Sequence, residues 1–411
     1  MRNNKVVFIC SVFLIITVIT LVLYLFIMNK YNKHERTVII ESDFNLEVLK
    51  RTNEKNNDNY LVSPYSMEQA MAMLKDGASG NTKAQIEKLI GNNTKAINNN
   101  SVKDANGVFI KDQYKDVIEN NYVKLLKDNH KAELLYDKFD TPEVINKWVN
   151  EKTDGMIPTL LNDISKDFVL GLANAIAIDV EWKQPFDGAA TSNAEFTKKD
   201  GTKMNVNMMH NSYESDGGAY YIKSKKTQGI IIPYKDDTNL EFIAIMPDGN
   251  IDEYIKKLDK KEFETLEDSK RSSSRSLHIN LGLPKFSYSY DYSKFMEMLK
   301  DMGMTDAFDE KDADFTNIIA RNYMKKVGIE NLYVSTAIHK TYIDLNEKGT
   351  KAAAVTYFGL DKATAIREEY DTINISFNKP FLYMIRDKKN NTLLFTGVVN
   401  TPSEYVKNTS R

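Results

Sequence analysis

The 411-residue sequence is poor in the residues that build disulfide-stapled folds and most hydrolytic sites, with one cysteine, nine prolines and five histidines. Because Cys10 has no partner, there is no intrachain disulfide and no cysteine-based metal site, and we expect neither a metal nor another cofactor. A Ser-His-Asp combination can be written from Ser66, His339 and Asp179, but no nucleophile elbow, zinc-protease pair, Walker loop or dinucleotide fingerprint accompanies it. The sequence therefore predicts a protein that is not an enzyme.

An excess of charge of one sign is also missing. Lysine and arginine number 55 and aspartate and glutamate 57, which leaves a formal net charge of -2 at pH 7. The lysines are scattered among acidic residues, as on a solvated surface, and we expect no nucleic-acid partner. The hydrophobic content of 42% is sufficient for a large core.

One long hydrophobic run is present, from Val6 to Met28, and basic residues flank it on both sides. A helix of roughly 23 residues would reach about 35 Å, enough to cross a hydrocarbon core of about 30 Å. The run exceeds the apolar part of a secretory signal, about 7 to 15 residues, and no small-x-small cleavage site follows. We favour an uncleaved anchor over a cleaved signal, so that residues 1–36 comprise a cytoplasmic tail, the anchor at about 6–28 and a polar stalk.

This anchor predicts that the rest of the chain lies outside the cell membrane, or is secreted if the segment is cleaved. The flanking charges do not settle the orientation. The bias toward lysine, asparagine and isoleucine is compatible with an AT-rich bacterial genome.

Helical and strand-like segments are mixed along the rest of the chain. Ser63 is placed to cap a helix with Pro64 in its first turn, and an amphipathic helix closed by Gly155 is expected from Ile145 to Ile157. Apolar or alternating runs predict strands at Thr37–Ile40, Asn106–Ile110, Phe168–Val180, Ala219–Ile222, Gly229–Tyr234, Leu240–Pro247, Leu277–Tyr288, Ile338–Leu345, Ile373–Phe377, Phe377–Ile385 and Leu393–Pro402. This mixture predicts an α+β protein.

The stretch Glu347–Thr356 is unusual because it follows a strand, passes Gly349 and continues as a run of small residues without proline. Thr350, Ala352, Ala354 and Thr356 recur at period two, so an extended chain would place them on one face, small enough to enter between existing strands. A helical or flexible connector is the alternative for this stretch alone.

The same stretch resembles the hinge of the reactive-centre loop of the serpin family, Glu-x-Gly-Thr-x-Ala-Ala-Ala-x-Thr. The matching residues are Glu347, Gly349, Thr350, Ala352, Ala353, Ala354 and Thr356. Further family landmarks follow in order: Ser63-Pro64-x-Ser66, the segment around Trp182, Leu283-Pro284-Lys285-Phe286, and the two C-terminal strands. The resemblance covers a single domain at about 37–403, with a reactive loop at about 347–372 and a polar tail at 404–411.

The resemblance implies the serpin fold, about eight or nine helices around three β-sheets, with an exposed reactive-centre loop that can insert into the central sheet. It also implies two functional clusters. The family's shutter would comprise Ser63, Ser66, Asn174 and His339, with Ser66 and His339 as partners of Asn174. The breach, where the loop enters the sheet, would comprise Trp182, Lys285 and Glu347, with Lys285 paired to Glu347.

The function implied is that of a suicide-type inhibitor, which traps a serine protease as an acyl-enzyme when its cleaved loop inserts into its own sheet. The family's spacing selects Ala363-Thr364 as the reactive bond, and thus an elastase-like or subtilisin-like target; Lys362 or Arg367 would instead select a trypsin-like target. The partners expected are the protease and, through the N-terminal helix, the membrane, and we expect a monomer. The alternatives are a non-inhibitory serpin that acts as a surface binding protein, and a membrane-bound structural or adhesion module.

Overall fold

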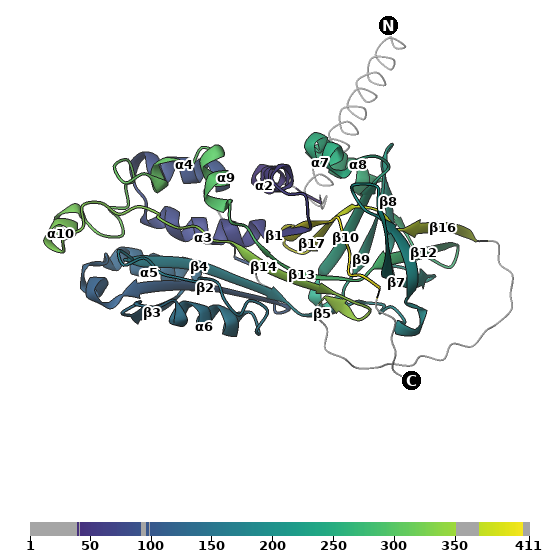
Figure 1. Ribbon diagram of the computed structural model, residues 1–411, viewed down its shortest axis with the longest axis horizontal. Coiled ribbons are helices and arrows are strands. Elements are labelled where there is room, and N and C mark those ends of the chain that lie inside the picture. The colour runs from purple at the N-terminus through teal and green to yellow at the C-terminus, as the bar shows by residue number, and fades with distance from the viewer. Residues whose placement is uncertain (1–38, 41, 92–95, 98, 351–369, 406–411) are drawn as a thin grey trace, which may run out of the picture. The chain divides into compact units, whose positions relative to one another are not determined.

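The computed structural model describes residues 39–40, 42–91, 96–97, 99–350 and 370–405, all within the unit Ile39–Arg411 (Figure 1). Within these ranges, no helix combines the length and the apolarity needed to cross a membrane. Several predictions made above fall outside the described residues: the apolar segment at 6–28, the hinge residues Ala352, Ala353, Ala354 and Thr356, and the reactive bond Ala363-Thr364.

Most of the predicted helices form, and their ends follow local chemistry. The side chain of Ser63 accepts a hydrogen bond from the backbone N–H of Ser66, and Pro64 opens the helix, as the sequence predicts. The helix predicted to reach Ile157 ends earlier, at Lys152, because Asp154 and Gly155 adopt left-handed backbone angles. The described α-helices are α2 (Asp43–Glu54), α3 (Pro64–Gly77), α4 (Gly80–Ile90), α5 (Asn120–His130), α6 (Glu143–Lys152), α7 (Ile251–Lys257), α8 (Lys260–Asp268), α9 (Phe295–Asp301) and α10 (Arg321–Lys326).

Two antiparallel-rich sheets form one side of the fold. The seven-stranded sheet has the order β1 (Tyr60–Val62), β18 (Thr392–Val399), β17 (Phe381–Asp387), β10 (Leu240–Pro247), β9 (Thr227–Pro233), β8 (Tyr220–Lys223) and β11 (Arg271–Ser272). A four-stranded sheet has the order β16 (Asp371–Ser376), β12 (Leu277–Pro284), β7 (Lys203–Tyr213) and β6 (Ser192–Thr197). The strand predicted at Thr37–Ile40 is wrong for its two described residues, since Ile39 and Ile40 are buried but pair with no strand.

The central sheet is divided into two pieces, so the described strands form four sheets rather than the expected three. One piece has the order β3 (Glu133–Asp137), β2 (Val102–Lys111) and β4 (Leu170–Ile178). The other has the order β13 (Phe286–Asp291), β14 (Lys340–Leu345), β15 (Gly349–Thr350) and β5 (Val180–Glu181). Because β5 follows β4 after a single residue, the two pieces meet at the β5 end.

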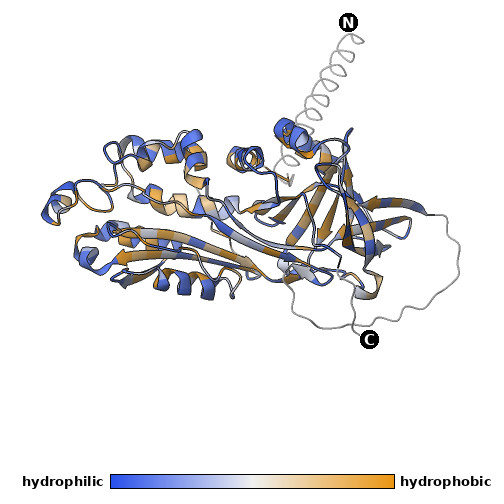
Figure 2. Cartoon of the chain, viewed as in Figure 1, coloured by the Kyte–Doolittle hydropathy of each residue, from blue (hydrophilic) through white to orange (hydrophobic). Residues whose placement is uncertain are grey.

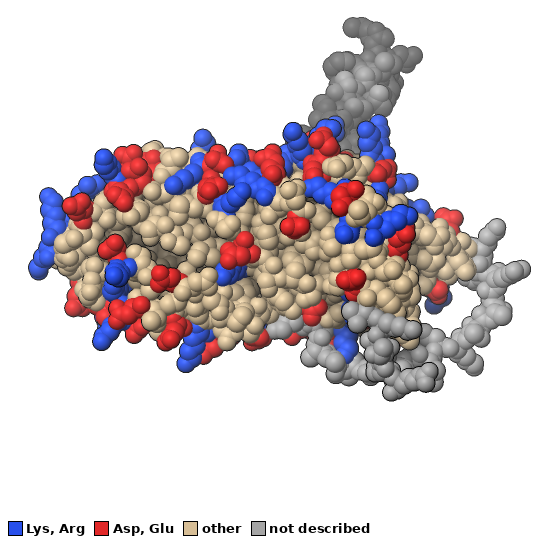
Figure 3. Space-filling view, viewed as in Figure 1, with Lys and Arg blue, Asp and Glu red and all other residues tan. Residues whose placement is uncertain are grey.

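Helices cover both faces of the first piece of the central sheet, with α3 on one face and α6 on the other (Figure 1). The α6 side has its own small core, in which Phe109, Trp148 and Ala175 are buried. Figure 2 shows the strands of the seven-stranded sheet largely in the hydrophobic colour, and their side chains form the largest buried cluster with those of β7 and β12. The α+β class is therefore confirmed. On the face shown in Figure 3, basic and acidic side chains are interspersed.

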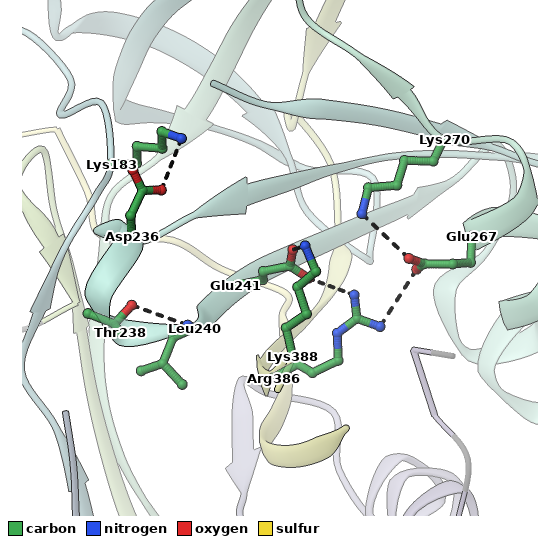
Figure 4. Close-up of polar contacts among 9 residues, drawn as sticks. All are labelled: Lys183, Asp236, Thr238, Leu240, Glu241, Glu267, Lys270, Arg386 and Lys388. Carbon is green, nitrogen blue, oxygen red and sulfur yellow. Dashed lines mark hydrogen bonds and ion pairs between the residues drawn. The ribbon is translucent and has the colours of Figure 1, made fainter. Parts of the chain in front are cut away.

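A buried ion cluster fastens the seven-stranded sheet to the end of α8 (Figure 4). The fully buried guanidinium of Arg386 on β17 lies 2.6 Å from Glu241 on β10 and 3.6 Å from Glu267 on α8. Lys388 lies 3.5 Å from Glu241, and Lys270 lies 3.5 Å from Glu267. Burial alone would raise the pKa of the Glu241 carboxyl, but Arg386 and the two lysines lower that pKa overall. The cluster keeps a charged pair stable in the interior of this sheet.

Candidate functional site: the hinge and the slot in the central sheet

The segment that leads into the hinge is fastened to the chain that follows β5. The indole N–H of Trp182 donates to the carbonyl of Asn346 at 2.9 Å, and the Trp182 backbone N–H donates to the carbonyl of Lys348 at 2.8 Å. The Phe186 N–H donates to the carbonyl of Glu347 at 2.8 Å. Three consecutive hinge carbonyls, at 346, 347 and 348, are thereby satisfied from one short segment.

Two hinge residues form a strand, β15 (Gly349–Thr350), between β14 and β5. Gly349 pairs with Glu181 and Thr350 with Val180, while Thr350 also pairs with Leu345 on the other side. A Cβ at Gly349 would lie 1.9 Å from the carbonyl oxygen of Val180 and 2.8 Å from the Cα of Glu181. Only glycine lets two backbones approach this closely, which gives a physical reason for Gly349. The connector alternative is therefore wrong for Gly349–Thr350.

The Thr350 side chain points into the protein and is 3% exposed. Its hydroxyl lies 2.5 Å from the hydroxyl of Tyr234, which follows β9. The Tyr234 ring stacks on Trp182 with centroids 4.5 Å apart and planes at 5°. Thr350 was predicted to lie on the inward face of the hinge, and its burial confirms this; the other inward positions lie outside the described residues.

A salt bridge holds the base of the hinge. Lys285 Nζ lies 2.9 Å from Glu347 Oε2 and 3.1 Å from Oε1, as the resemblance implies. Thr191 adds a hydrogen bond to Oε1 at 2.8 Å. Burial would raise the pKa of the Glu347 carboxyl, but the hydrogen bonds from Lys285 and Thr191 and the lysine charge lower it overall. Glu347 is therefore held ionised at the entrance to the central sheet.

Beyond β15, a slot separates β4 from β14. In the described residues β4 pairs only with β2, and β14 pairs with β13 and, at Leu345 alone, with β15. The slot between them is lined by Leu61, Met156, Ile157, Ile176, Ala177, Ile178, Tyr342, Ile343, Asp344, Thr350, Ile385 and Phe395. Two strand edges thus face a space that begins where β15 ends, and such edges present backbone donors and acceptors to a further strand.

The segment after α6, residues 156–161, crosses this slot. Met156 and Ile157 line the slot, so Ile157 does not belong to the helix that was predicted to include it. The Asn146 side chain fixes the segment, since it donates to the carbonyl of Leu161 at 2.8 Å and accepts from the Leu160 N–H at 2.8 Å. Across the slot, Lys340 donates to the carbonyl of Thr159 at 3.3 Å.

The expected shutter residues meet at the N-terminus of α3, but their contacts differ from those expected. Ser66 Oγ donates to the backbone carbonyl of Asn174 on β4 at 3.3 Å. His339, just before β14, accepts from the backbone N–H of Ser63 at 2.9 Å through Nε2. The expected contact between Asn174 and His339 is wrong, because the two lie on opposite edges of the slot and each bonds to α3 instead. One helix turn therefore holds both edges.

The side chain of Asn174 bonds within its own piece of the sheet. Its amide donates to Asp104 at 2.6 Å and to Asn106 at 3.1 Å, both on the neighbouring strand β2. Tyr65 of α3 donates to the other oxygen of Asp104. Burial raises the pKa of the Asp104 carboxyl although both hydrogen bonds lower it. Asp104 thus supports the edge strand β4 from the neighbouring strand β2, and the sequence motifs do not include it.

His339 is almost fully buried, and this burial lowers the pKa of its imidazole to about 3. The neutral ring keeps Nε2 free to accept the Ser63 N–H. The prediction of a buried, hydrogen-bonded histidine is therefore confirmed.

Two residues of the site were not found from the sequence, Tyr234 and Asp104. Asp104 carried a weak signal, as a carboxylate in a chain segment that becomes strongly apolar a few residues later. Tyr234 is an ordinary residue in sequence, and only the tertiary structure brings it to Thr350. Thr191 belongs to the family landmark around Trp182, but its hydrogen bond to Glu347 was not predicted.

Comparisons with known proteins agree with this geometry. A family model described as Serpin (serine protease inhibitor) matches residues 40–402. An uncharacterized serpin-like protein of Methanosarcina acetivorans is 30% identical over 383 residues, which cover 86% of this chain and 83% of that protein. The leukocyte elastase inhibitor of Bos taurus is 30% identical over 370 residues, which cover 84% of this chain and 93% of the inhibitor.

Solved structures give the same result. The thermophilic serpin tengpin in its native state is 31% identical, with a TM-score of 0.73 and coverage of 87% of this chain and 92% of tengpin. Tengpin in its latent state is 27% identical, with a TM-score of 0.69 and coverage of 89% and 99%. Since the family model spans most of the sequence and the hinge, slot and α3 cluster lie within it, the chain belongs to the serpin family.

Proposed function

We propose that this protein inhibits a serine protease by inserting its cleaved reactive loop into the slot between β4 and β14. The observation that carries the proposal is the position of β15, whose two residues occupy the mouth of the slot between β14 and β5. A strand that continues from Thr350 would run between two edges that have no partner along the slot among the described residues. Each added residue would gain backbone hydrogen bonds and buried area.

The chemistry follows from the acyl-enzyme that serine proteases form. The protease attacks the exposed loop, releases the new amino terminus and remains esterified to the residue before the cut. Insertion of about twelve residues at about 3.3 Å each would carry the attached protease roughly 40 Å along the sheet. Small displacements of catalytic groups cost orders of magnitude in rate, so deacylation stalls once the active site is distorted.

The target is proposed to be an elastase-like or subtilisin-like protease cut at Ala363-Thr364. One finding supports the elastase-like class: a relative at 30% identity is a leukocyte elastase inhibitor. Cleavage after Lys362 or Arg367 would give a trypsin-like target instead.

The test is incubation of residues 37–411 with elastase, subtilisin and trypsin in turn. The expected result is a complex that survives SDS, with a released fragment whose mass places the cut after Ala363. The melting temperature of the loop-cleaved protein should rise well above that of the intact protein. Cleavage by every protease without a stable complex and without this rise would contradict inhibition and favour a non-inhibitory serpin.

The location of the protein is a separate proposal, which rests on the sequence at 6–28. We infer that this segment tethers the domain at the outer side of the cell membrane, since its length matches a bilayer core. Alkaline carbonate extraction of membranes and protease treatment of intact cells test this directly. Release by carbonate, or protection of the domain from added protease, would contradict it.

A further inference from the structure

Tyr234 is a side chain of the seven-stranded sheet that reaches into the central sheet. Its backbone is fixed on both sides, since the Lys183 N–H donates to the carbonyl of Pro233 at 3.0 Å and the Lys235 N–H donates to the carbonyl of Glu181 at 2.9 Å. Its ring is 1% exposed and stacks on Trp182, which is itself fully buried. The position of the phenol hydroxyl is thus set by these contacts with residues 181–183 and not by the hinge.

The hydroxyl of Tyr234 meets the hinge at Thr350. The two hydroxyls lie 2.5 Å apart, and both side chains are buried. In the described part of the chain, the Tyr234 hydroxyl has no other hydrogen-bond partner. If β15 left the sheet, this hydroxyl would remain buried without a partner, which is unfavourable. The contact therefore favours the seated hinge over a withdrawn one.

The contact also distinguishes one strand register from its neighbours. Shifting an extended chain by one residue turns every side chain to the opposite face. A slip in either direction would bring Gly349 or Lys351 opposite the phenol, and neither offers a hydroxyl. The register with Thr350 inward is also the one that sends the small residues Ala352, Ala354 and Thr356 into the slot.

We propose that Tyr234 is a positioning residue for loop insertion, which seats Thr350 at the mouth of the slot and sets the register of the strand that follows. The inference rests on the proposed function, because it assigns Tyr234 a step in the same insertion. It adds that the first strand pair is formed before cleavage, so that insertion starts at residue 351 rather than at the hinge base.

The experiment compares five variants of residues 37–411: Tyr234→Phe, Thr350→Val, the double variant of these two, Thr350→Ser and the control Tyr122→Phe. The control removes another buried tyrosine hydroxyl, which donates to the carbonyl of Met73 at 3.1 Å in a different core cluster. The first measurement is hydrogen exchange, by mass spectrometry, of peptides that cover 346–350 in the uncleaved protein. We expect Tyr234→Phe and Thr350→Val each to speed this exchange roughly tenfold, as expected for the loss of one buried hydrogen bond.

Thr350→Ser keeps the hydroxyl and should exchange like the unaltered protein, and Tyr122→Phe should leave the hinge peptides unchanged. The double variant Tyr234→Phe/Thr350→Val should be no faster than either single variant, since both remove the same bond. Peptides from β10 should exchange as before in all five variants, which would show that the fold is intact.

The second measurement is the number of inhibitor molecules cleaved per protease trapped. Tyr234→Phe should raise this number at least twofold while the rate of initial cleavage stays unchanged, because the hinge must seat before the strand can extend. Unchanged hinge exchange in Tyr234→Phe would overturn the inference even if trapping occurs. A wild-type chain that traps no protease would overturn the proposed function instead, while the exchange measurement would still decide the role of Tyr234.

Discussion

The seven-stranded sheet and the central sheet are built from similar strands, yet they are completed to different degrees. Every residue of β10 and β17 is buried, and β10 pairs along its length with β9 on one side and β17 on the other. In the central sheet, the first five residues of β4 are half-buried, and the described chain pairs β4 only with β2. The central strands of the first sheet have a neighbour on both sides, whereas the second sheet has, within the ranges the structure describes, an unpaired edge on each side of the slot.

We call the seven-stranded sheet the frame, and we call the central sheet, which would accept the inserted strand, the acceptor. The frame keeps Arg386 and Glu241 in its interior, and neither of these two residues lines the slot. The acceptor is held by a few polar contacts from outside: α3 bonds to both edges through Ser63 and Ser66, and Tyr234 holds Thr350. Changes in the frame should therefore affect the intact and the loop-cleaved protein alike, whereas changes around the slot should affect mainly the intact protein.

The largest effect is expected from Arg386→Leu. This variant leaves the buried carboxylate of Glu241 with only the two lysines to compensate it, and loss of one partner of a buried pair costs about 3 to 4 kcal/mol. Urea unfolding of the intact and the loop-cleaved forms measures the cost, which should be equal in the two. The double variant Arg386→Leu/Glu241→Leu should regain much of the loss, because an apolar pair of similar volume replaces an ion pair at little net cost. A loss confined to the intact form would contradict the separation of frame and acceptor.

The next largest effect is expected from Gly349→Ala, which alters the central sheet. The added Cβ would overlap the backbone of Val180 and Glu181, which cannot move aside like a flexible side chain. We expect β15 to leave the sheet, with a local loss of about 2 to 3 kcal/mol, at the upper end of the cost of overpacking. The rate of backbone hydrogen exchange at Gly349 and Thr350 measures this local loss of stability. The matched control is Gly188→Ala nearby, where a Cβ meets nothing within 4 Å, and equal effects at both positions would rule out the close approach as the cause.

A pH effect of intermediate size is expected from His339 at the α3 end of the slot. The pKa of His339 is about 3 in the folded protein, against an ordinary value of about 6.5 in the unfolded chain. Between these values the unfolded chain binds a proton that the folded chain does not, so stability is full above pH 6.5 and falls by about 1.4 kcal/mol per pH unit below it. The urea midpoint from pH 7 to 5 measures this dependence. His339→Gln retains an acceptor but does not titrate, so its midpoint should fall less steeply; equal slopes would contradict the assignment.

The sequence alone was sufficient for the elements whose signals are local. The alternation at residues 340–345 predicted β14, the Ser63-Pro64 pair predicted the start of α3, and an apolar run interrupted at Glu241 predicted β10. The resemblance added which of these segments meet, and it placed Lys285 beside Glu347. These successes share a cause, because each rests on residue spacing within one segment or on a motif common to the family.

The contacts that were missed join residues that are far apart in sequence, and at least one residue of each pair carries no motif. Tyr234 and Thr350 are separated by 116 positions, and Glu241 and Arg386 by 145. A tyrosine after a strand or a glutamate within one does not indicate which partner the packing will bring to it. The expected contact between Asn174 and His339 was wrong for the same reason, since it depends on the division of the central sheet, which no strand pattern reveals, whereas Ser66 does bond to Asn174.

The smallest effect is expected from Lys285→Met at the base of the hinge. The side chain of Lys285 is 35% exposed and that of Glu347 is 18% exposed, so solvent screens the pair and its loss should cost less than about 1 kcal/mol. Thr191 continues to donate to Glu347, and the hinge carbonyls at 346 to 348 keep their hydrogen bonds, which limits the damage further. The urea midpoint of the intact protein should therefore shift only slightly. The rate of hydrogen exchange at 346–350 should rise less in Lys285→Met than in Gly349→Ala. In the combined variant Lys285→Met/Thr191→Val this rate should rise more than in either single variant, because the Glu347 carboxylate loses both partners. If Lys285→Met alone released the hinge as fully as Gly349→Ala does, the salt bridge rather than the backbone pairing would hold β15 in the central sheet.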